Sequence, residues 1–272
     1  MAKPSILSDL SVWVRLLGAS LTGQLTYRRS FLLEMAGRFT LTLLELAAVF
    51  VLFDHVDAIG GFTKWEVVYL YGVASIGLGT AELFTDGLND MTALVRQGTL
   101  DGVLVRPLSP LLQIMARQCR PLHAGRVLQG MLALVSALVV LQWPAQPLQV
   151  AMLVVNLVST TLVFGAIFVM GAATKIFTIQ SAEAFSAFTY GGVQLAQFPL
   201  NVYPRWLQRL FVFVVPVGVT SYAPALVVLG KGPDPSLGPW APYAVPFVTL
   251  AFVGVALLWW RTALDRYQST GS

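Results

Sequence analysis

Charged residues are scarce in this sequence. Only 11% of its 272 residues are charged, whereas soluble domains carry about 25%. Burial in a core does not explain the shortage, because a globule of this size still needs a large polar surface. Hydrophobic residues reach 56%, and the mean hydropathy is +0.73. The composition excludes an ordinary soluble domain and predicts an integral membrane protein.

The sequence also lacks the motifs of ATP hydrolysis and of several enzyme classes. It contains no Gly-x-x-x-x-Gly-Lys-Ser/Thr phosphate loop, no His-Glu-x-x-His pair and no Gly-x-Ser-x-Gly elbow. The single cysteine, Cys119, excludes an intramolecular disulfide and a Cys-based metal site. We therefore expect neither an enzyme nor a cofactor or metal on this chain, and no nucleic-acid partner.

Several apolar stretches are long enough to form membrane-spanning helices, each of which needs about 20 residues. They cover residues 31–53, 65–84, 127–143, 148–173, 182–198 and 240–260. The sequence therefore predicts an all-α integral membrane protein of about six transmembrane helices, with a single transmembrane domain over residues 1–272.

Basic residues are unevenly distributed around these stretches. With six spans and both termini in the cytoplasm, the inner side receives Lys3, Arg15, Arg28, Arg29, Arg96, Arg106, Arg117, Arg120, Arg126, Lys175, Arg261 and Arg266. The outer side receives Lys64, Arg205, Arg209 and Lys231. This asymmetry follows the positive-inside rule. We expect a multi-pass protein of the plasma (inner) membrane with both termini cytoplasmic.

A further apolar stretch, residues 207–229, is long enough to span but contains Pro216 and Pro224. Proline removes a helical hydrogen bond and bends or breaks a helix. A seventh span here would also place Arg261 and Arg266 outside. We therefore expect residues 203–229 to form re-entrant outer helices, packed against protein because irregular backbone is not tolerated in lipid.

Two segments outside the spans have helical patterns. Residues 1–30 alternate apolar and polar faces and predict an amphipathic helix in the cytoplasmic membrane interface, or alternatively a cytosolic helix docked on protein. In the inner loop 87–110, two short apolar stripes meet at Gly98, and the second ends at Pro107. This loop is expected to form two short helical pieces with a glycine joint.

Polar residues within the spans are candidates for a transport path. They are Glu45, Glu82, Glu183, Gln194 and Gln197. A buried carboxylate is costly in lipid, so these residues either contact a transported molecule or hold helices together. The two histidines have plainer interpretations: His55, between Asp54 and Asp57, belongs to a solvated helix end, and His123 is expected at headgroup level.

The order of these elements, together with the run RQGTLDGVLVRPLSP from Arg96 to Pro110, resembles the permeases of type-2 ABC exporters. Within that class it is similar to an ABC-2-like family formerly classed as a domain of unknown function. The run QFPLNVYP from Gln197 to Pro204 is similar to a second patch of that family. The resemblance covers essentially the whole chain and implies the ABC-2 type exporter fold.

The resemblance also implies a mechanism. Two permeases, identical or different, would form a dimer above two ABC ATPase subunits, which bind ATP and Mg, and the exported compound would be hydrophobic or amphipathic. The inner loop would be the coupling helix that contacts the ATPase, through Arg96, Gln97, Gly98, Thr99, Leu100, Asp101, Gly102, Leu104, Arg106 and Pro107. The same arginines alternatively hold the loop at anionic lipid headgroups.

Three other functions are compatible with a polytopic protein. A scaffold subunit of a vitamin-uptake system would show longer cytoplasmic helices with small-Arg-small motifs, which the inner loop does not clearly show. An ion-coupled carrier would use Glu45 and Glu183, and such carriers often show internal repeats. A membrane enzyme lacks a catalytic constellation in this sequence.

Overall fold

The computed structural model describes residues 28–118, 120–178 and 182–268, which are mostly helical and contain no β-strand. The elements are α2 (Arg28–Phe53), α3 (Lys64–Thr85), η2 (Asp86–Asp90), α4 (Met91–Arg96), α5 (Leu100–Leu104), α6 (Pro110–Arg117), η3 (Pro121–His123), α7 (Ala124–Val140), α8 (Pro147–Phe177), α9 (Ala182–Ala196), η5 (Leu200–Val202), α10 (Arg205–Arg209), η6 (Leu210–Val214), α11 (Val217–Val228) and α12 (Ala241–Asp265). The amphipathic helix predicted within residues 1–30 falls, up to residue 27, outside the described residues.

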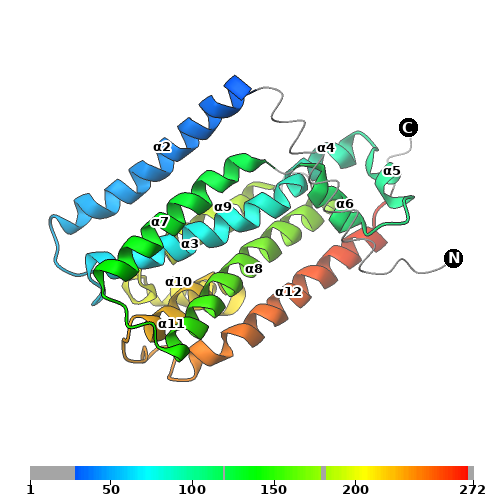
Figure 1. The fold of residues 1–272 in the computed structure, drawn as a ribbon. Coiled ribbons are helices and arrows are strands. Elements are labelled where there is room, and N and C mark those ends of the chain that lie inside the picture. Colours follow the sequence, from blue (N-terminus) through cyan, green and yellow to red (C-terminus); the bar gives the residue numbers. More distant parts are fainter. Residues whose placement is uncertain (1–27, 119, 179–181, 269–272) are drawn as a thin grey trace.

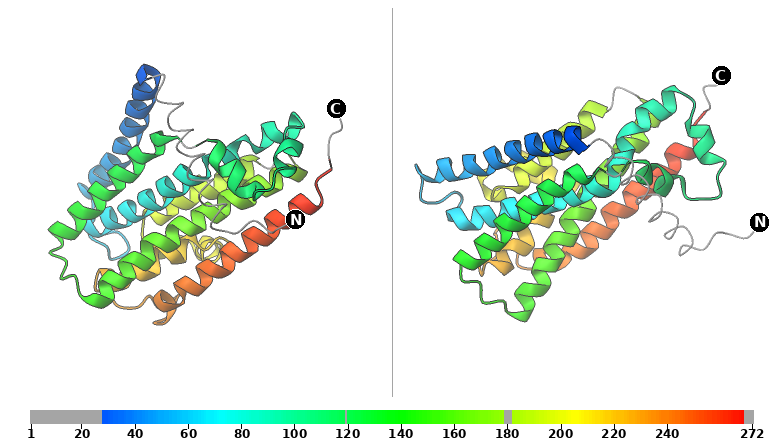
Figure 2. Two further views of the ribbon diagram at one scale, coloured as in Figure 1. Left: turned by 45° about the vertical axis from the view of Figure 1, so that its right-hand side comes forward. Right: turned by 45° about the horizontal axis from the view of Figure 1, so that its top comes forward.

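The long helices lie side by side in a bundle, with α2 along one edge (Figure 1, Figure 2). The short helices α4, α5 and α6 gather at one end of the bundle, beside the C-terminal end of α12. The helices α10 and α11 lie toward the other end, near the beginnings of α8 and α12. These two ends are called the inner end and the outer end below, following the predicted topology.

The helix α3 forms the centre of the bundle and begins with a capping box. The Thr63 backbone N–H donates to the Glu66 carboxylate at 2.7 Å, which satisfies a donor that the first helical turn leaves free. Farther along, a Cβ on Gly72 would lie 2.8 Å from the backbone nitrogen of Leu134, and one on Gly130 would lie 2.9 Å from that of Ile76. This glycine pair lets the backbones of α3 and α7 approach closely, as small residues do in membrane helix packing.

Not all of the predicted spans are long helices. By length and composition, four of the described helical stretches qualify: Met35–Phe53, Lys64–Arg96, Pro147–Phe177 and Ala241–Asp265. A fifth is added if the bent pair Arg205–Val214 and Val217–Val228 counts as one span. The helices α7, with 17 residues, and α9, with 15, are about 25 and 22 Å long at 1.5 Å per residue. Six spans therefore stay a prediction.

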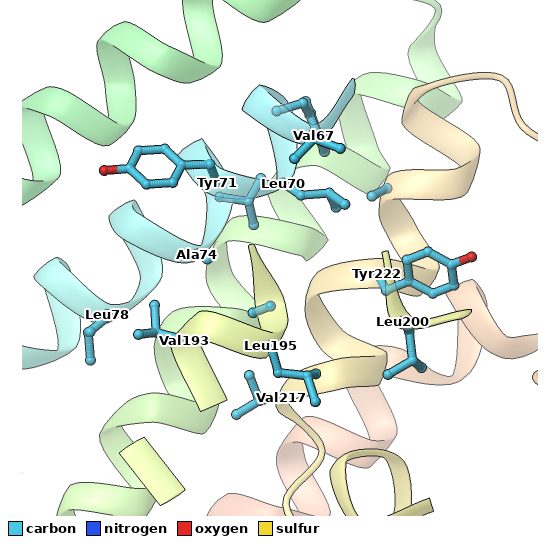
Figure 3. Packing of buried hydrophobic residues seen from close by; sticks show 14 of the residues in the cluster. Val67, Leu70, Tyr71, Ala74, Leu78, Val193, Leu195, Leu200, Val217 and Tyr222 are labelled. Carbon is cyan, nitrogen blue, oxygen red and sulfur yellow. The ribbon is translucent and has the colours of Figure 1, made fainter. Parts of the chain in front are cut away.

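Buried apolar side chains form two main clusters. The larger one joins α3, α7, α8, α9 and α11, and Figure 3 shows Leu78, Val193 and Val217 from three of these helices within it. The second cluster lies at the inner end and joins α4, α5 and α6 to the inner parts of α8 and α12. The inner short helices are thus packed onto the bundle.

The outer broken element consists of α10, η6 and α11, with a bend of 95° between η6 and α11. Its two ends contact one loop: Asn201 donates to the Gly60 carbonyl at 2.8 Å, and Lys231 donates to the Gly61 carbonyl at 2.8 Å. The chain therefore enters and leaves this element at the same end of the bundle. Nearly all of α11 is buried, as expected for a proline-containing segment packed against protein.

A single side chain satisfies the backbone that Pro224 disrupts. Pro224 has no N–H, so the Thr220 carbonyl one turn earlier loses its helical partner. Asn156 of α8 donates to that carbonyl at 2.8 Å and to the Ser221 carbonyl at 2.9 Å, and accepts from the Tyr69 hydroxyl at 2.9 Å. Asn156 is completely buried, so these bonds fix α11 to α8 and α3.

Candidate functional site

The inner platform, residues 86–117, is the first part of the candidate site. Its buried side chains include Leu88, Met91, Leu94, Leu100 and Ile114, each at most 3% exposed. They pack against small residues of α8 and against Ala256, Trp260 and Ala263 of α12. The platform is therefore packed directly against the inner ends of two long helices.

A glycine joint separates α4 from α5, as the sequence predicts. Gly98 has a φ of +64°, in the left-handed region that other residues adopt at a cost. The reversal of direction at this joint exposes one polar rim, which we call the inner rim. It comprises Arg96, Gln97, Thr99, Gly102, Val105, Arg106 and Pro107, all exposed.

The predicted coupling residues divide into three groups by exposure. Those of the inner rim are exposed, Gly98, Asp101 and Leu104 are half-buried, and Leu100 is completely buried and anchors the platform. Tyr267, beyond the end of α12, has a raised pKa because of burial and the nearby Asp101 carboxylate, which places the end of α12 beside α5.

Val105 is an inner-rim residue that the sequence analysis missed. It is 82% exposed at the end of α5, between Leu104 and Arg106. A valine is normally exposed to this degree in isolation or at an interaction site. The predicted apolar stripe comprises Leu100, Val103 and Leu104 and leaves Val105 outside it. The Val105 N–H still donates to the Asp101 carbonyl at 3.2 Å, so the residue continues the helical turn with its side chain off the buried stripe.

A groove of about 560 Å³ lies beside the inner rim, between α5 and α6. It is lined by Thr99, Gly102, Val103, Arg106, Leu108, Gln113, Ala116 and Arg117. Gln113 of α6 holds the two sides of the groove together, because its amide donates to the carbonyl of Val103 in α5 at 3.3 Å and to the Leu108 carbonyl at 2.8 Å. Arginine at both edges makes the groove suited to an acidic partner.

A buried charged cluster is the second part of the site. The His123 ring lies between two carboxylates, with Nδ1 3.1 Å from Glu82 Oε2 and Nε2 3.5 Å from Asp86 Oδ1. Arg120 Nε lies 3.2 Å from Asp86 Oδ2, and the Tyr190 hydroxyl donates to Glu82 at 3.4 Å. The cluster therefore joins the end of α3, the beginning of α7, the platform and α9.

The depth of His123 at headgroup level stays a prediction, but the side chain is 5% exposed and paired, so it lies inside the protein and does not face the headgroups. Burial acts to lower the pKa of His123, but the hydrogen bonds and charges of Asp86 and Glu82 outweigh it and raise the pKa above its usual value. The sequence held one signal for this cluster. Glu82 and Asp86 are four residues apart, a spacing that puts two acids on one helix face and calls for a cation nearby.

The other candidate polar residues do not converge on one site. Glu45 is half-buried on α2, Gln194 is exposed and Gln197 is 3% exposed. The side chain of Glu183 lies outside the described residues. Glu82 is the one whose surroundings are defined, and its contacts are those of a structural ion pair.

The comparison with protein families decides the identity of the chain. A family model described as ABC-2 family transporter protein matches residues 39–271. This chain belongs to the ABC-2 transporter family. The match includes the inner platform, the charged cluster and the outer broken element. No curated protein and no solved structure matches the chain.

For this ABC-2 protein, membership of the family indicates a multi-pass membrane component of a transporter. Permeases of this family are generally not catalytic themselves and imply an ABC ATPase as partner.

Proposed function

We propose that this chain is the permease subunit of an ABC exporter whose ATP and Mg are bound by a separate ATPase chain. The observation that carries the proposal is the inner rim, an exposed polar edge with one exposed valine on a loop whose buried face packs against α8 and α12. Such a loop both contacts a partner and transmits its movement. The inner rim is then the coupling surface.

The transmission follows two routes. In the first, the ATPase displaces α4 and α5, and the shared apolar cluster carries α8 and α12 with them. In the second, a displacement of Asp86 in the platform moves His123, which is paired with Asp86 and also with Glu82 at the end of α3. Close-packed interiors transmit such displacements because they do not deform freely.

The topology proposed with this function has six passes, both termini in the cytoplasm of the plasma membrane, and re-entrant helices over residues 203–229. Single cysteines in place of Val202 and Ser236, on a Cys119→Ala background, test the re-entrant element. Both positions are exposed and flank the element. Labelling of both from the outside supports re-entry, and labelling from opposite sides contradicts it.

The exported compound is proposed to be hydrophobic or amphipathic, and the permease to act as a dimer with a second copy or a second permease. Large apolar side chains remain exposed along α2 and α12, such as Leu41, Leu44, Phe247 and Leu250. These surfaces fit contact with lipid and with a second permease.

The experiment that tests the proposal is a mild-detergent purification of the tagged chain from its native host, with mass spectrometry of the proteins that accompany it. Recovery of a P-loop ATPase is expected. A variant carrying Val105→Asp and Arg106→Glu should lose it, whereas Arg261→Glu, an exposed charge reversal at the same end, should not. A chain that is recovered alone across several detergents would contradict the proposal and favour an ion-coupled carrier.

A further inference from the structure

A second groove lies at the opposite end of the bundle from the inner rim. It has a volume of about 460 Å³ and is formed by α10, η6 and the loop before α12. Its lining consists of Leu200, Arg205, Gln208, Arg209, Val212, Phe213, Pro235, Ser236 and Leu237. The groove thus has an apolar floor and two arginines at one edge, and we call it the outer groove.

The two arginines have no acidic partner in the part of the chain that the structure describes. Neither Arg205 nor Arg209 forms an ion pair there, although both line the same groove. They are four residues apart on one helix, a spacing at which like charges repel each other. Gln208, which also lines the groove, is neutral and leaves both positive charges uncompensated; its amide nitrogen donates to the Tyr203 carbonyl at 2.7 Å.

An anion would remove this repulsion, and a phosphate fits best. The guanidinium group presents paired N–H donors that match phosphate oxygens, and two of them are able to hold one phosphate from two sides. The neighbouring Asp234 carboxylate does not compete, because it accepts from Tyr222 and from Ser236.

The surroundings of the outer groove indicate an amphipathic ligand. Phe213 is 82% exposed and Trp206 is 68% exposed on the same short segment. Tryptophan is enriched at the level of lipid headgroups, where its ring is apolar on one side and wet on the other. The adjacent π-helical turn, η6, is a rare backbone form that is frequent at functional sites.

We propose that the outer groove binds an anionic phospholipid, with its phosphate between Arg205 and Arg209 and an acyl chain along Val212 and Phe213. The lipid holds α10 at the outer membrane surface and covers the apolar segment that leads into the 95° bend. This role is independent of the ATPase, since the groove and the inner rim lie at opposite ends of the bundle (Figure 1).

The test is native mass spectrometry of the purified chain after incubation with equal amounts of phosphatidylglycerol and phosphatidylcholine. The wild type should retain roughly ten times as much phosphatidylglycerol as phosphatidylcholine. Arg205→Gln with Arg209→Gln should reduce the preference to about twofold or less. Lys64→Gln, which removes an outer cation that lies over the Phe50 ring instead of in the groove, should leave it unchanged.

A photoactivatable phosphatidylglycerol locates the bound lipid. Adducts on residues 205–214 support the proposal. If the double glutamine variant fails to fold, a variant with both arginines replaced by lysine is used instead, and its adducts are expected on the same residues. Equal retention of the two lipids by the wild type, or adducts that lie elsewhere, would overturn it. The proposal would also be overturned if the double glutamine variant kept its lipid preference but changed its oligomeric mass. A second copy of the chain would then cover the groove.

Discussion

The two ends of this molecule both contain broken helices, but they are stabilised in different ways. At the outer end, Asn156 and Trp143 donate to carbonyls of α11, and Lys231 joins the end of that element to α3. At the inner end, apolar contacts and one charged cluster attach the platform, and its rim remains exposed. Directional hydrogen bonds fix the outer element in one geometry, whereas the close-packed apolar contacts of the platform make α4, α5, α8 and α12 shift together.

The difference assigns a role to each end. If the outer broken element is re-entrant, as proposed, its backbone polar groups must be bonded by protein, and the hydrogen bonds of Asn156 and Trp143 supply such partners. The inner platform lies outside the apolar layer in the predicted topology, where exposed polar groups cost little. It therefore suits a moving partner.

The largest effect on stability is expected from removing the histidine of the inner cluster. His123→Leu deprives the buried Glu82 and Asp86 carboxylates of their shared cation, and breaking a buried pair costs about 3–5 kcal/mol. Thermal unfolding in detergent measures the loss. His55→Leu is the matched control, because His55 is exposed just beyond α2 and its ring lies within hydrogen-bond distance of the Val51 carbonyl, with no carboxylate to neutralise; an equal loss in both variants would contradict this account.

At the outer end, Asn156→Leu should destabilise α11. The substitution leaves the Thr220 carbonyl without a partner, at a cost of about 1–3 kcal/mol for each buried group left unsatisfied. The loss should appear both in thermal unfolding and as increased labelling of a cysteine placed in α11. Asn201→Ala, which removes an exposed hydrogen bond to Gly60, should have little effect; unchanged stability in Asn156→Leu would show that the outer end is not fixed by these bonds.

The stability of the inner cluster should depend on pH. The pKa of His123 is raised in the folded protein, so its contribution is complete below about pH 6.5, the usual value. The contribution is lost as the pH rises from there through the raised pKa. Melting temperatures measured across this range should fall in the wild type and change less in His123→Gln, and parallel curves would argue against a protonated histidine.

The smallest effect concerns the joint of the inner platform. Gly98→Ala places a Cβ at a φ of +64° and should cost about 1–2 kcal/mol of local stability. Gly125→Ala in α7 is the control, because a Cβ there meets no atom within 4 Å and the residue lies outside the inner rim. If Gly98 sets the direction of α5, only the first variant should weaken ATPase recovery, and equal recovery with both variants would show that the joint is not required.

Much of the fold could be predicted from local signals. Composition and apolar stretches indicate the membrane helices, Gly98 indicates the joint, and Pro216 with Pro224 indicates the broken outer element. The sequence analysis missed the pairing of residues far apart in the chain. Nothing local shows that His123 lies between Glu82 and Asp86, because that contact depends on how α7 packs on α3.

The exposed side chains were predicted only in part. Leu100 and Val105 are both apolar residues of one short segment, yet the first is completely buried and the second 82% exposed. The predicted stripe of Leu100, Val103 and Leu104 faces the inner cluster and leaves Val105 outside it, but nothing in the sequence marks Val105 as part of a contact surface. Similarly, the outer groove brings Arg205 beside residues 235–237, which are separated by the whole of α11.

The most direct test of the inner rim as the coupling surface is photo-crosslinking in native membranes. A photoreactive amino acid in place of Val105 should form an adduct with an ATPase chain, and the yield should change when ATP is added. The same amino acid in place of Trp206, which is exposed at the outer end, should form none. An ATPase adduct from position 206, or none from position 105, would contradict the central claim.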